Sequence, residues 1–146
     1  MPLLDLRDLR DTFRTHLLGV GGLPSIKYQN RNFDLGSVTN DPPHYIQEVS
    51  GVSDEEQSST SFVESVGIYQ LNVRVATGDG TETGEDLAKT LADRFAPAQA
   101  LQSGTTQQCF SLYKTVRPTP FVDPDDSDWV VFPVQVLWRA FTVNNI

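Results

Sequence analysis

The fold is decided in the stretch Val66-Gly-Ile-Tyr-Gln-Leu-Asn-Val-Arg-Val-Ala-Thr-Gly-Asp-Gly-Thr-Glu-Thr-Gly-Glu-Asp-Leu-Ala-Lys-Thr-Leu-Ala-Asp-Arg-Phe95, where apolar–polar alternation gives way to a helical period across an acidic, glycine-rich turn. The alternation predicts a strand over residues 62–76, with an apolar face made by Tyr69, Leu71, Val73 and Val75. Thr83, followed by two acidic residues, is typical of a helix N-cap. The spacing then predicts a helix from about Gly84 to Phe95.

Three glycines in this turn, Gly78, Gly80 and Gly84, follow a strand and precede a helix, as in loops that cradle a pyrophosphate. Their spacing is one residue longer than the dinucleotide-binding pattern, and no Gly-Lys-Ser/Thr follows. Acidic side chains that would repel a phosphate surround them, namely Asp79, Glu82, Glu85 and Asp86. The sequence therefore favours a structural turn. A small enzyme or ligand-binding domain that uses this loop is the alternative from a different class.

The N-terminal half adds a helix and a second strand. Apolar residues at helical spacing predict an amphipathic helix over residues 4–18, with Leu6, Leu9, Phe13 and Leu17 on one face. A short extended segment is expected over residues 26–33 and a strand over residues 44–50. Residues 51–61 are polar and have almost nothing to bury, which predicts an exposed loop.

The C-terminal half predicts two more strands, over residues 108–116 and 129–143, joined by a Pro- and Asp-rich hairpin over residues 117–128. The last strand is apolar on both faces and so needs cover on both, with Leu137 and Phe141 opposite Phe132, Val134, Val136 and Trp138. Together these elements predict a single α+β domain over residues 1–146. Its mainly antiparallel sheet would have four to five strands, with two helices packed on one face.

Composition argues against several classes of function. The 146 residues include 11 Lys and Arg against 19 Asp and Glu, a net charge of −8, which disfavours a protein that grips nucleic acid. Cys109 is the only cysteine, so it has no partner for an internal disulfide or a Cys-x-x-Cys site. No apolar run approaches the roughly 20 residues of a membrane-spanning helix, and the charged N-terminus does not resemble a signal peptide.

The polar clusters do not combine into a catalytic or metal site. A calcium loop could use Asp123, Asp125, Asp126 and Asp128, but the glycine and glutamate of an EF-hand are missing. A solvated hairpin fits that segment better, with an opportunistic cation as the alternative. His16 and His44 are the only histidines, and there is no Gly-x-Ser-x-Gly motif to supply a nucleophile. The sequence predicts no catalytic residue, no cofactor and no metal, and hence no enzyme.

The order of these features over nearly the whole chain resembles a family of small proteins of long-tailed phages, of the tail terminator or tail completion type. The resemblance is one of order and residue type, and the chain departs from it in the polar segment 51–61. It is carried by Leu6-Arg-Asp-Leu-Arg-Asp-Thr-Phe-Arg14, Pro43-His-Tyr-Ile-Gln-Glu-Val49, Gly67-Ile-Tyr-Gln-Leu-Asn-Val-Arg-Val75 with the helix after it, and Asp128-Trp-Val-Val-Phe-Pro-Val-Gln-Val-Leu-Trp-Arg139.

The resemblance implies a structural protein of the virion tail and neck, assembled in the host cytoplasm. It would form a ring of six copies that caps the tail tube, stops tube polymerisation and presents the head-joining surface. The implied partners are other copies of the chain, the tail tube protein and a head-tail connector or head-completion protein. DNA would be passing cargo, eased by an acidic channel, and no membrane is involved. The alternatives are another neck or head-completion subunit, or a tube-like tail protein.

In a ring each copy presents two different surfaces that match. We expect one of them in the open face and edges of the sheet, with the candidates Gln70, Asn72, Arg74, Trp138 and Arg139. The two polar loops are expected to contact the tube or head proteins along the axis, through Asp54, Glu55, Glu56, Arg117, Asp125 and Asp126.

Overall fold

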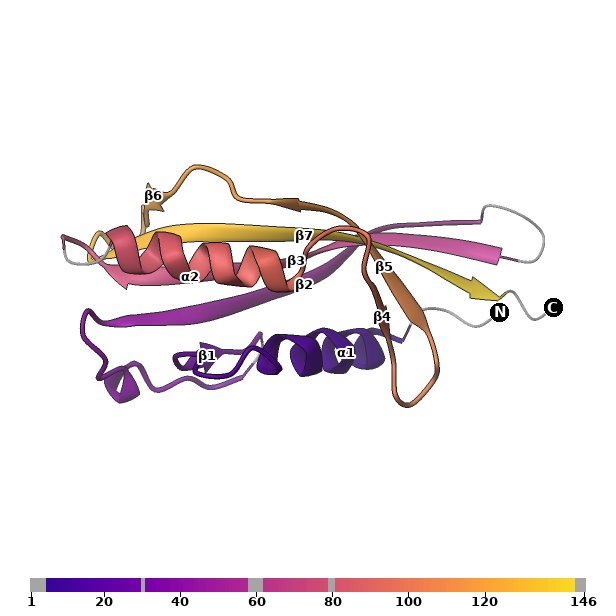
Figure 1. Ribbon diagram of the computed structural model, residues 1–146, viewed down its shortest axis with the longest axis horizontal. Coiled ribbons are helices and arrows are strands. Elements are labelled where there is room, and N and C mark those ends of the chain that lie inside the picture. The colour runs from indigo at the N-terminus through magenta and orange to yellow at the C-terminus, as the bar shows by residue number, and fades with distance from the viewer. Residues whose placement is uncertain (1–4, 30, 58–61, 79–80, 144–146) are drawn as a thin grey trace.

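The computed structural model describes residues 5–29, 31–57, 62–78 and 81–143, with residues 51–57, 62 and 142–143 described by their backbone. Within them the chain forms two α-helices, a short 3-10 helix and seven strands (Figure 1). In chain order these are α1 (Leu6–Leu18), β1 (Ile26–Lys27), η1 (Leu35–Ser37), β2 (His44–Gln57), β3 (Phe62–Ala76), α2 (Thr81–Arg94), β4 (Ala100–Gln102), β5 (Cys109–Val116), β6 (Phe121–Val122) and β7 (Trp129–Val143).

The strands form one curled, mixed sheet in the order β1-β2-β3-β7-β5-β4, with β6 pairing on β7. β1 runs parallel to β2, and the other neighbours are antiparallel. The predicted α+β class is confirmed, but the prediction of four to five mainly antiparallel strands was wrong in strand number and in β1. β1 lies within the extended segment expected over residues 26–33. The two strands that the sequence did not predict, β4 and β6, are three and two residues long, too short to show a period of two.

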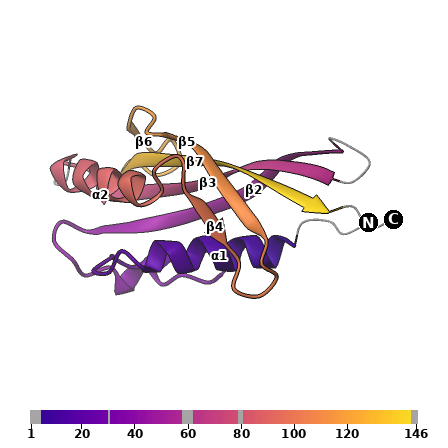
Figure 2. The same ribbon diagram turned by 45° about the vertical axis from the view of Figure 1, so that its right-hand side comes forward.

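Both helices pack on the same face of the sheet (Figure 2). The ring of Phe13 from α1 lies 4.8 Å from that of Tyr69 in β3 and 6.1 Å from that of Phe95 behind α2. It also lies 5.7 Å from the ring of Phe110 in β5, centroid to centroid. The face of β3 that the helices cover is the apolar face predicted from the sequence, since Tyr69, Leu71, Val73 and Val75 are all buried. The core therefore forms where the two periodicities predict it.

The long hairpin of β2 and β3 corrects the expected loop at residues 51–61. β2 continues to Gln57 and pairs with β3 as far as Val63, with a bulge between Val52 and Asp54. Residues 58–61 of the expected loop lie outside the described residues. Backbone pairing with β3 satisfies the N–H and C=O groups whatever the side chains are, so a strand that extends beyond the core need not be apolar. This end of the hairpin projects past both helices (Figure 1).

Helix α2 begins at Thr81, before the predicted start near Gly84, so Thr83 lies inside the helix and is not its N-cap. Gly84 also lies within α2, where a Cβ would overlap the aromatic ring of Phe132. Its role is close packing of helix against sheet. Of the other two glycines in the predicted turn, Gly78 has a φ of 92°, and Gly80 lies outside the described residues.

Strand β5 alternates between buried and exposed residues only in its first half. Phe110 and Leu112 are buried, but the register with β7 shifts between Leu112 and Lys114. The bulge turns Thr115 toward the helices, where its Oγ1 donates to the carbonyl oxygen of Phe95 at 2.5 Å. Lys114 is consequently exposed, although a regular strand would place it on the same face as Phe110 and Leu112.

Candidate functional site

The face of the sheet turned away from the two helices is here called the open face. Along β3 the alternation places Gln70, Asn72 and Arg74 on this face, opposite the buried Leu71 and its neighbours. β2 and β7 flank β3. Their residues that pair with Gln70, Asn72 and Arg74 lie on the same face and complete the surface. The open face therefore spans three long, directly paired strands.

A ladder of polar side chains crosses the open face from β2 to β7. Gln135 Nε2 donates to Gln70 Oε1 at 3.2 Å, and Gln70 Nε2 donates to Asn72 Oδ1 at 2.7 Å. Asn72 Nδ2 and Arg74 Nη1 each donate to Gln47 Oε1 at 3.5 Å, which is long for a hydrogen bond. The structure thus brings together three of the sequence-derived contact candidates, Gln70, Asn72 and Arg74.

At one end of this ladder, Arg74 ties β3 to the turn between β6 and β7. Its guanidinium forms an ion pair with the carboxylate of Asp123 and lies 5.9 Å from the ring centre of Tyr45. The hydrogen bond from Arg74 lowers the pKa of the Asp123 carboxyl, while burial raises the pKa of Tyr45. Arg74 is therefore already engaged within the subunit, which limits what it can offer to a partner.

Apolar side chains lie beside the ladder and face solvent. Ile68 on β3 is 37% exposed and pairs with the half-buried Leu137 on β7, with Val49 of β2 nearby at 41% exposed. Further along, Phe141 and Tyr113 are both more than two-fifths exposed. We call these five residues the apolar band. Exposed apolar side chains gathered on one face of a sheet are typical of protein–protein contacts.

The candidates at the end of β7 separate onto opposite faces. Trp138 is fully buried on the helix side, with its ring centre 5.7 Å from that of Phe110. It belongs to the subunit core, and its Nε1 has no hydrogen-bond partner among the described residues. Arg139 is on the open face, where it lies 5.0 Å from the ring centre of Tyr113 and its Nε is 3.5 Å from Glu64 Oε1.

The expected axial contacts divide between the two ends of the molecule. The end of β2 and the start of β3 lie at one end of the long axis, and β6 lies at the other (Figure 1). Asp125 and Asp126 are exposed on the turn between β6 and β7, and Arg117 is exposed beyond β5. The side chains of the other candidates, Asp54, Glu55 and Glu56, lie outside the described residues.

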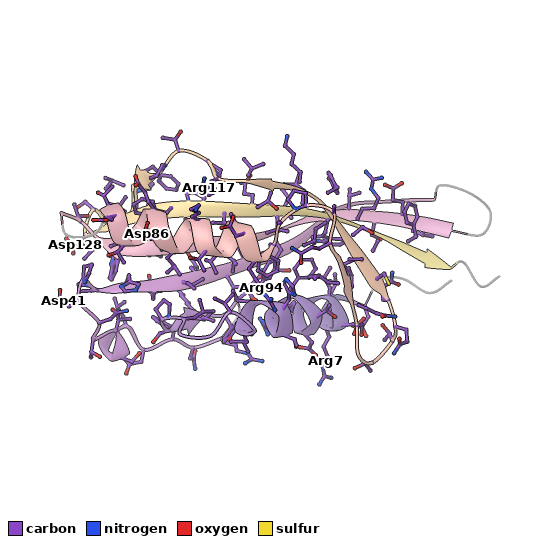
Figure 3. All side chains as sticks on the ribbon, in the orientation of Figure 1. Arg7, Asp41, Asp86, Arg94, Arg117 and Asp128 are labelled. Atoms are coloured by element: carbon purple, nitrogen blue, oxygen red, sulfur yellow. The ribbon has the colours of Figure 1, made fainter. Side chains whose placement is uncertain are left out.

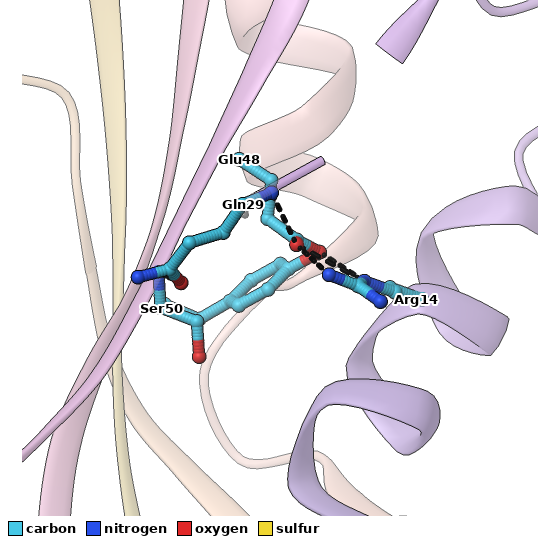
Figure 4. Close-up of polar contacts among 5 residues, drawn as sticks. Arg14, Gln29, Glu48 and Ser50 are labelled. Carbon is cyan, nitrogen blue, oxygen red and sulfur yellow. Dashed lines mark hydrogen bonds and ion pairs between the residues drawn. The ribbon is translucent and has the colours of Figure 1, made fainter. Parts of the chain in front are cut away.

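A buried ionic contact that the sequence did not reveal fastens α1 to the sheet (Figure 4). Arg14 Nε donates to Glu48 Oε2 at 2.9 Å, and its Nη2 donates to Oε1 at 2.6 Å. Tyr69 Oη donates to Glu48 Oε2 at 2.7 Å, and Gln29 Oε1 accepts from the backbone N–H of Ser50 at 2.8 Å. The only sign of this contact in the sequence is the position of Glu48. It lies two residues after Ile46 and therefore on the same, helix-facing side of β2.

The Glu48 contact also changes the titration of its neighbours. Hydrogen bonding to the carboxylate raises the pKa of Arg14. Burial, followed by the nearby Glu48 charge, raises the pKa of Tyr69 well above its usual value. The site is therefore an Arg14–Glu48 ion pair to which the neutral phenol of Tyr69 donates a hydrogen bond. This arrangement fastens α1 to strands β2 and β3.

The candidate chemical groups are each engaged in local structure. His16 Nε2 lies 2.8 Å from the carbonyl oxygen of Arg94, and His44 Nδ1 lies 2.6 Å from that of Pro42. Asp123 Oδ1 accepts from the N–H of Asp125 at 2.9 Å, within the turn. Among the described residues no group of three His, Cys, Asp or Glu is placed to hold a metal ion. No helix in the described part of the chain is long and apolar enough to cross a membrane.

Comparisons with known proteins give a family and a fold. A family model described as phage tail terminator protein matches residues 10–138. No curated protein sequence matches the chain. One solved structure, whose name states no function, has 17% identity and a TM-score of 0.60 over 99% of both chains. At that identity the likeness shows a shared fold.

Proposed function

The chain belongs to the phage tail terminator family, and from that membership we propose that it is the tail subunit that closes the tube. It would form a ring of six copies on the last ring of the tail tube, stop further polymerisation, and present the surface to which the head is joined. Its place would be the tail and neck of the virion. The observation that carries this proposal is the match of the family model over residues 10–138.

The open face supports the ring. A ring contact is heterologous, so one surface of each copy covers a different surface of the next. The apolar band, in which Ile68 is 37% and Phe141 49% exposed, would gain from such cover because burial of apolar surface is favourable. Arg139 and Gln70 beside it would give the contact a polar rim.

The elongated shape supports a separation between ring contacts and axial contacts. The β2–β3 hairpin projects past the helices at one end of the long axis (Figure 1). A projecting hairpin can reach a tube or connector subunit without disturbing the packed core, and its acidic residues Asp54, Glu55 and Glu56 would make that contact polar. Arg117, which follows β5, is an exposed candidate away from this hairpin (Figure 3).

The solution mass of the purified chain, together with negative-stain images, tests this proposal. Isolated rings of six copies are expected, because a terminator must not stack on itself. Long tubes formed by the chain alone would favour a tube protein instead. A ligand-binding domain would stay a single subunit, and its melting temperature would rise with added nucleotide.

A further inference from the structure

Four arginines surround one hollow of about 240 Å³ beside helix α1. Three of them, Arg7, Arg10 and Arg14, are spaced three and four residues apart and so share one side of the helix. Arg31, from the segment after β1, faces them. Gln29 and Asp11 complete the lining. We call this the arginine hollow.

The arginine hollow is held in shape by the core. Arg14 is fixed by its paired hydrogen bonds to the buried Glu48. Two guanidinium groups also lie over the ring of Tyr28 in cation–π contacts. The central carbon of Arg14 is 4.7 Å from the ring centre and that of Arg31 is 5.4 Å from it. Because these groups are already ordered, a partner that binds them loses less conformational entropy.

The hollow carries more positive than negative charge. The ion pairs among the described residues involve Arg14, Arg74 and Arg139, and none involves Arg7, Arg10 or Arg31. Asp11 is the single acidic residue in the lining. A patch with these three further guanidinium groups, on a chain whose net charge is −8, is expected to attract an anionic surface.

The same chain offers such a surface at one end. Asp86 and Asp128 lie close to one end of the long axis, whereas Arg7 lies on α1 well away from it (Figure 3). The N–H of Thr77 donates to the carbonyl oxygen of Asp128 at 2.8 Å, which joins the β6–β7 turn to the region before α2. The acidic end consists of six exposed residues, Glu82, Glu85, Asp86, Asp125, Asp126 and Asp128.

We propose that the arginine hollow of one copy receives the acidic end of the neighbouring copy. This rests on the proposed ring, which requires two different surfaces that match in each heterologous contact. The two regions are opposite in charge and separate on the subunit, so one copy cannot satisfy both within itself. The contact places the β6–β7 turn between subunits, so Asp125 and Asp126 would serve the ring in place of the axial contacts expected from the sequence, and the β2–β3 hairpin is left for axial contacts.

Two charge-reversed variants test the contact. The hollow variant carries Arg7→Glu, Arg10→Glu and Arg31→Glu, and it keeps Arg14 because that residue holds Glu48. The acidic-end variant carries Glu85→Lys, Asp125→Lys and Asp128→Lys, and it keeps Asp126, whose Oδ1 accepts from the N–H of Asp128. Each variant alone should need at least about a tenfold higher concentration to assemble, since like charges then meet at every contact.

Mixing the two variants in equal amounts should restore rings at the wild-type concentration. In a ring in which the two variants alternate, the now negative hollow of one variant meets the now positive end of the other. The unchanged arginine hollow of the second variant meets the unchanged acidic end of the first, so all contacts are attractive. A variant with Arg7, Arg10 and Arg31 changed to Lys is the matched control, and it should assemble because the charge is kept. Melting curves of each variant establish that the subunits are folded before assembly is compared.

Four results would overturn the proposal. If the hollow variant forms rings at the wild-type concentration, this contact is refuted and the proposed function stands. The same conclusion follows if a mixture of the two folded variants fails to assemble. A hollow variant that assembles but no longer binds a short DNA duplex bound by the wild type would assign the hollow to phosphate. Wild-type protein that stays a single subunit, even with tail tube protein, would overturn this contact and the proposed function together.

Discussion

Arg14 of α1 and Glu48 of β2 form a hydrogen-bonded ion pair in the subunit interior, with the Glu48 carboxylate accepting from Nε and Nη2 of one guanidinium. The Glu48 side chain is fully buried, and that of Arg14 is 12% exposed. The pair joins the first helix to the sheet across 34 residues of sequence. It also orders the arginine hollow, so the stability of the subunit and the shape of that surface depend on the same contact.

Removal of Arg14 should therefore destabilise the subunit strongly. Arg14→Met leaves the Glu48 carboxylate buried without its counter-ion, which costs about 3–5 kcal/mol in the free energy of unfolding. Denaturant unfolding measures this value. Arg10→Met, on the same helix and outside the ion pairs of the described residues, is the control and should change stability by less than about 0.5 kcal/mol. If Arg14→Met and Arg10→Met lower the free energy of unfolding equally, the buried ion pair does not stabilise the subunit in the way proposed.

Gly84→Ala should destabilise the protein although alanine favours helices. The added Cβ overlaps the ring of Phe132, and overpacking costs about 1–3 kcal/mol, against about 1 kcal/mol gained in helix propensity. A double-mutant cycle with Phe132→Leu measures the coupling. Gly84→Ala should be tolerated better when it is combined with Phe132→Leu, because the smaller side chain leaves room for the added methyl group. Strictly additive effects of the two changes would contradict the packing account.

Stability should fall as the pH drops below about 6.5, partly because of His16. Burial lowers the pKa of His16 in the folded protein from its ordinary value of 6.5, so the unfolded chain binds a proton more readily. The stabilisation from neutral His16 is present above pH 6.5 and is lost as the pH falls through the folded-state pKa. Unfolding free energies between pH 7.5 and 5.5 should decline less in His16→Gln, which retains an N–H donor for the Arg94 carbonyl. Parallel declines would assign the pH dependence to other groups.

Charge placed in the apolar band should block assembly and leave the subunit folded. Ile68→Glu with Phe141→Glu puts two carboxylates where the proposed ring contact excludes water, and it should weaken association by about tenfold or more. Light scattering measures the mass over a range of concentrations. Leu35→Glu is the control, since Leu35 is 47% exposed on η1, away from the sheet. Rings that persist in the double variant would remove the open face from the contact.

Periodicity predicted the parts of the fold that pack against each other. The inward residues of β3 and of α1, such as Tyr69 and Phe13, follow from spacing alone because burial of one face is what produces the spacing. The last strand was predicted with the bounds that the structure shows, Trp129 to Val143. Its apolar residues on both faces also indicated an open face in need of cover.

Other features depend on pairing that has no local signature. The polar extension of β2 is a strand because β3 lies beside it, and its composition alone indicates a loop. Gly84 was assigned to a turn because a glycine near a helix start fits either role, and only the position of Phe132 decides between them.

Buried charges were the least predictable part. Asp8 has the sequence environment of a solvent-facing helical residue, yet its carboxylate accepts from Ser103 Oγ and from Thr106 Oγ1, the latter at 2.6 Å. Glu48 is similar, because its partner Arg14 lies on another element. Such pairs are specified by the tertiary structure, which the one-dimensional spacing of charges does not encode.

Imaging of tail tubes grown with and without this chain tests the tube-closing role most directly. Tube protein is polymerised at fixed concentration, the purified chain is added, and tube lengths and ends are recorded by negative stain. The proposed function predicts that growth stops and that one end of each tube carries a single added ring of the chain. Tubes that reach the same lengths with bare ends, while the chain remains in solution, would contradict it.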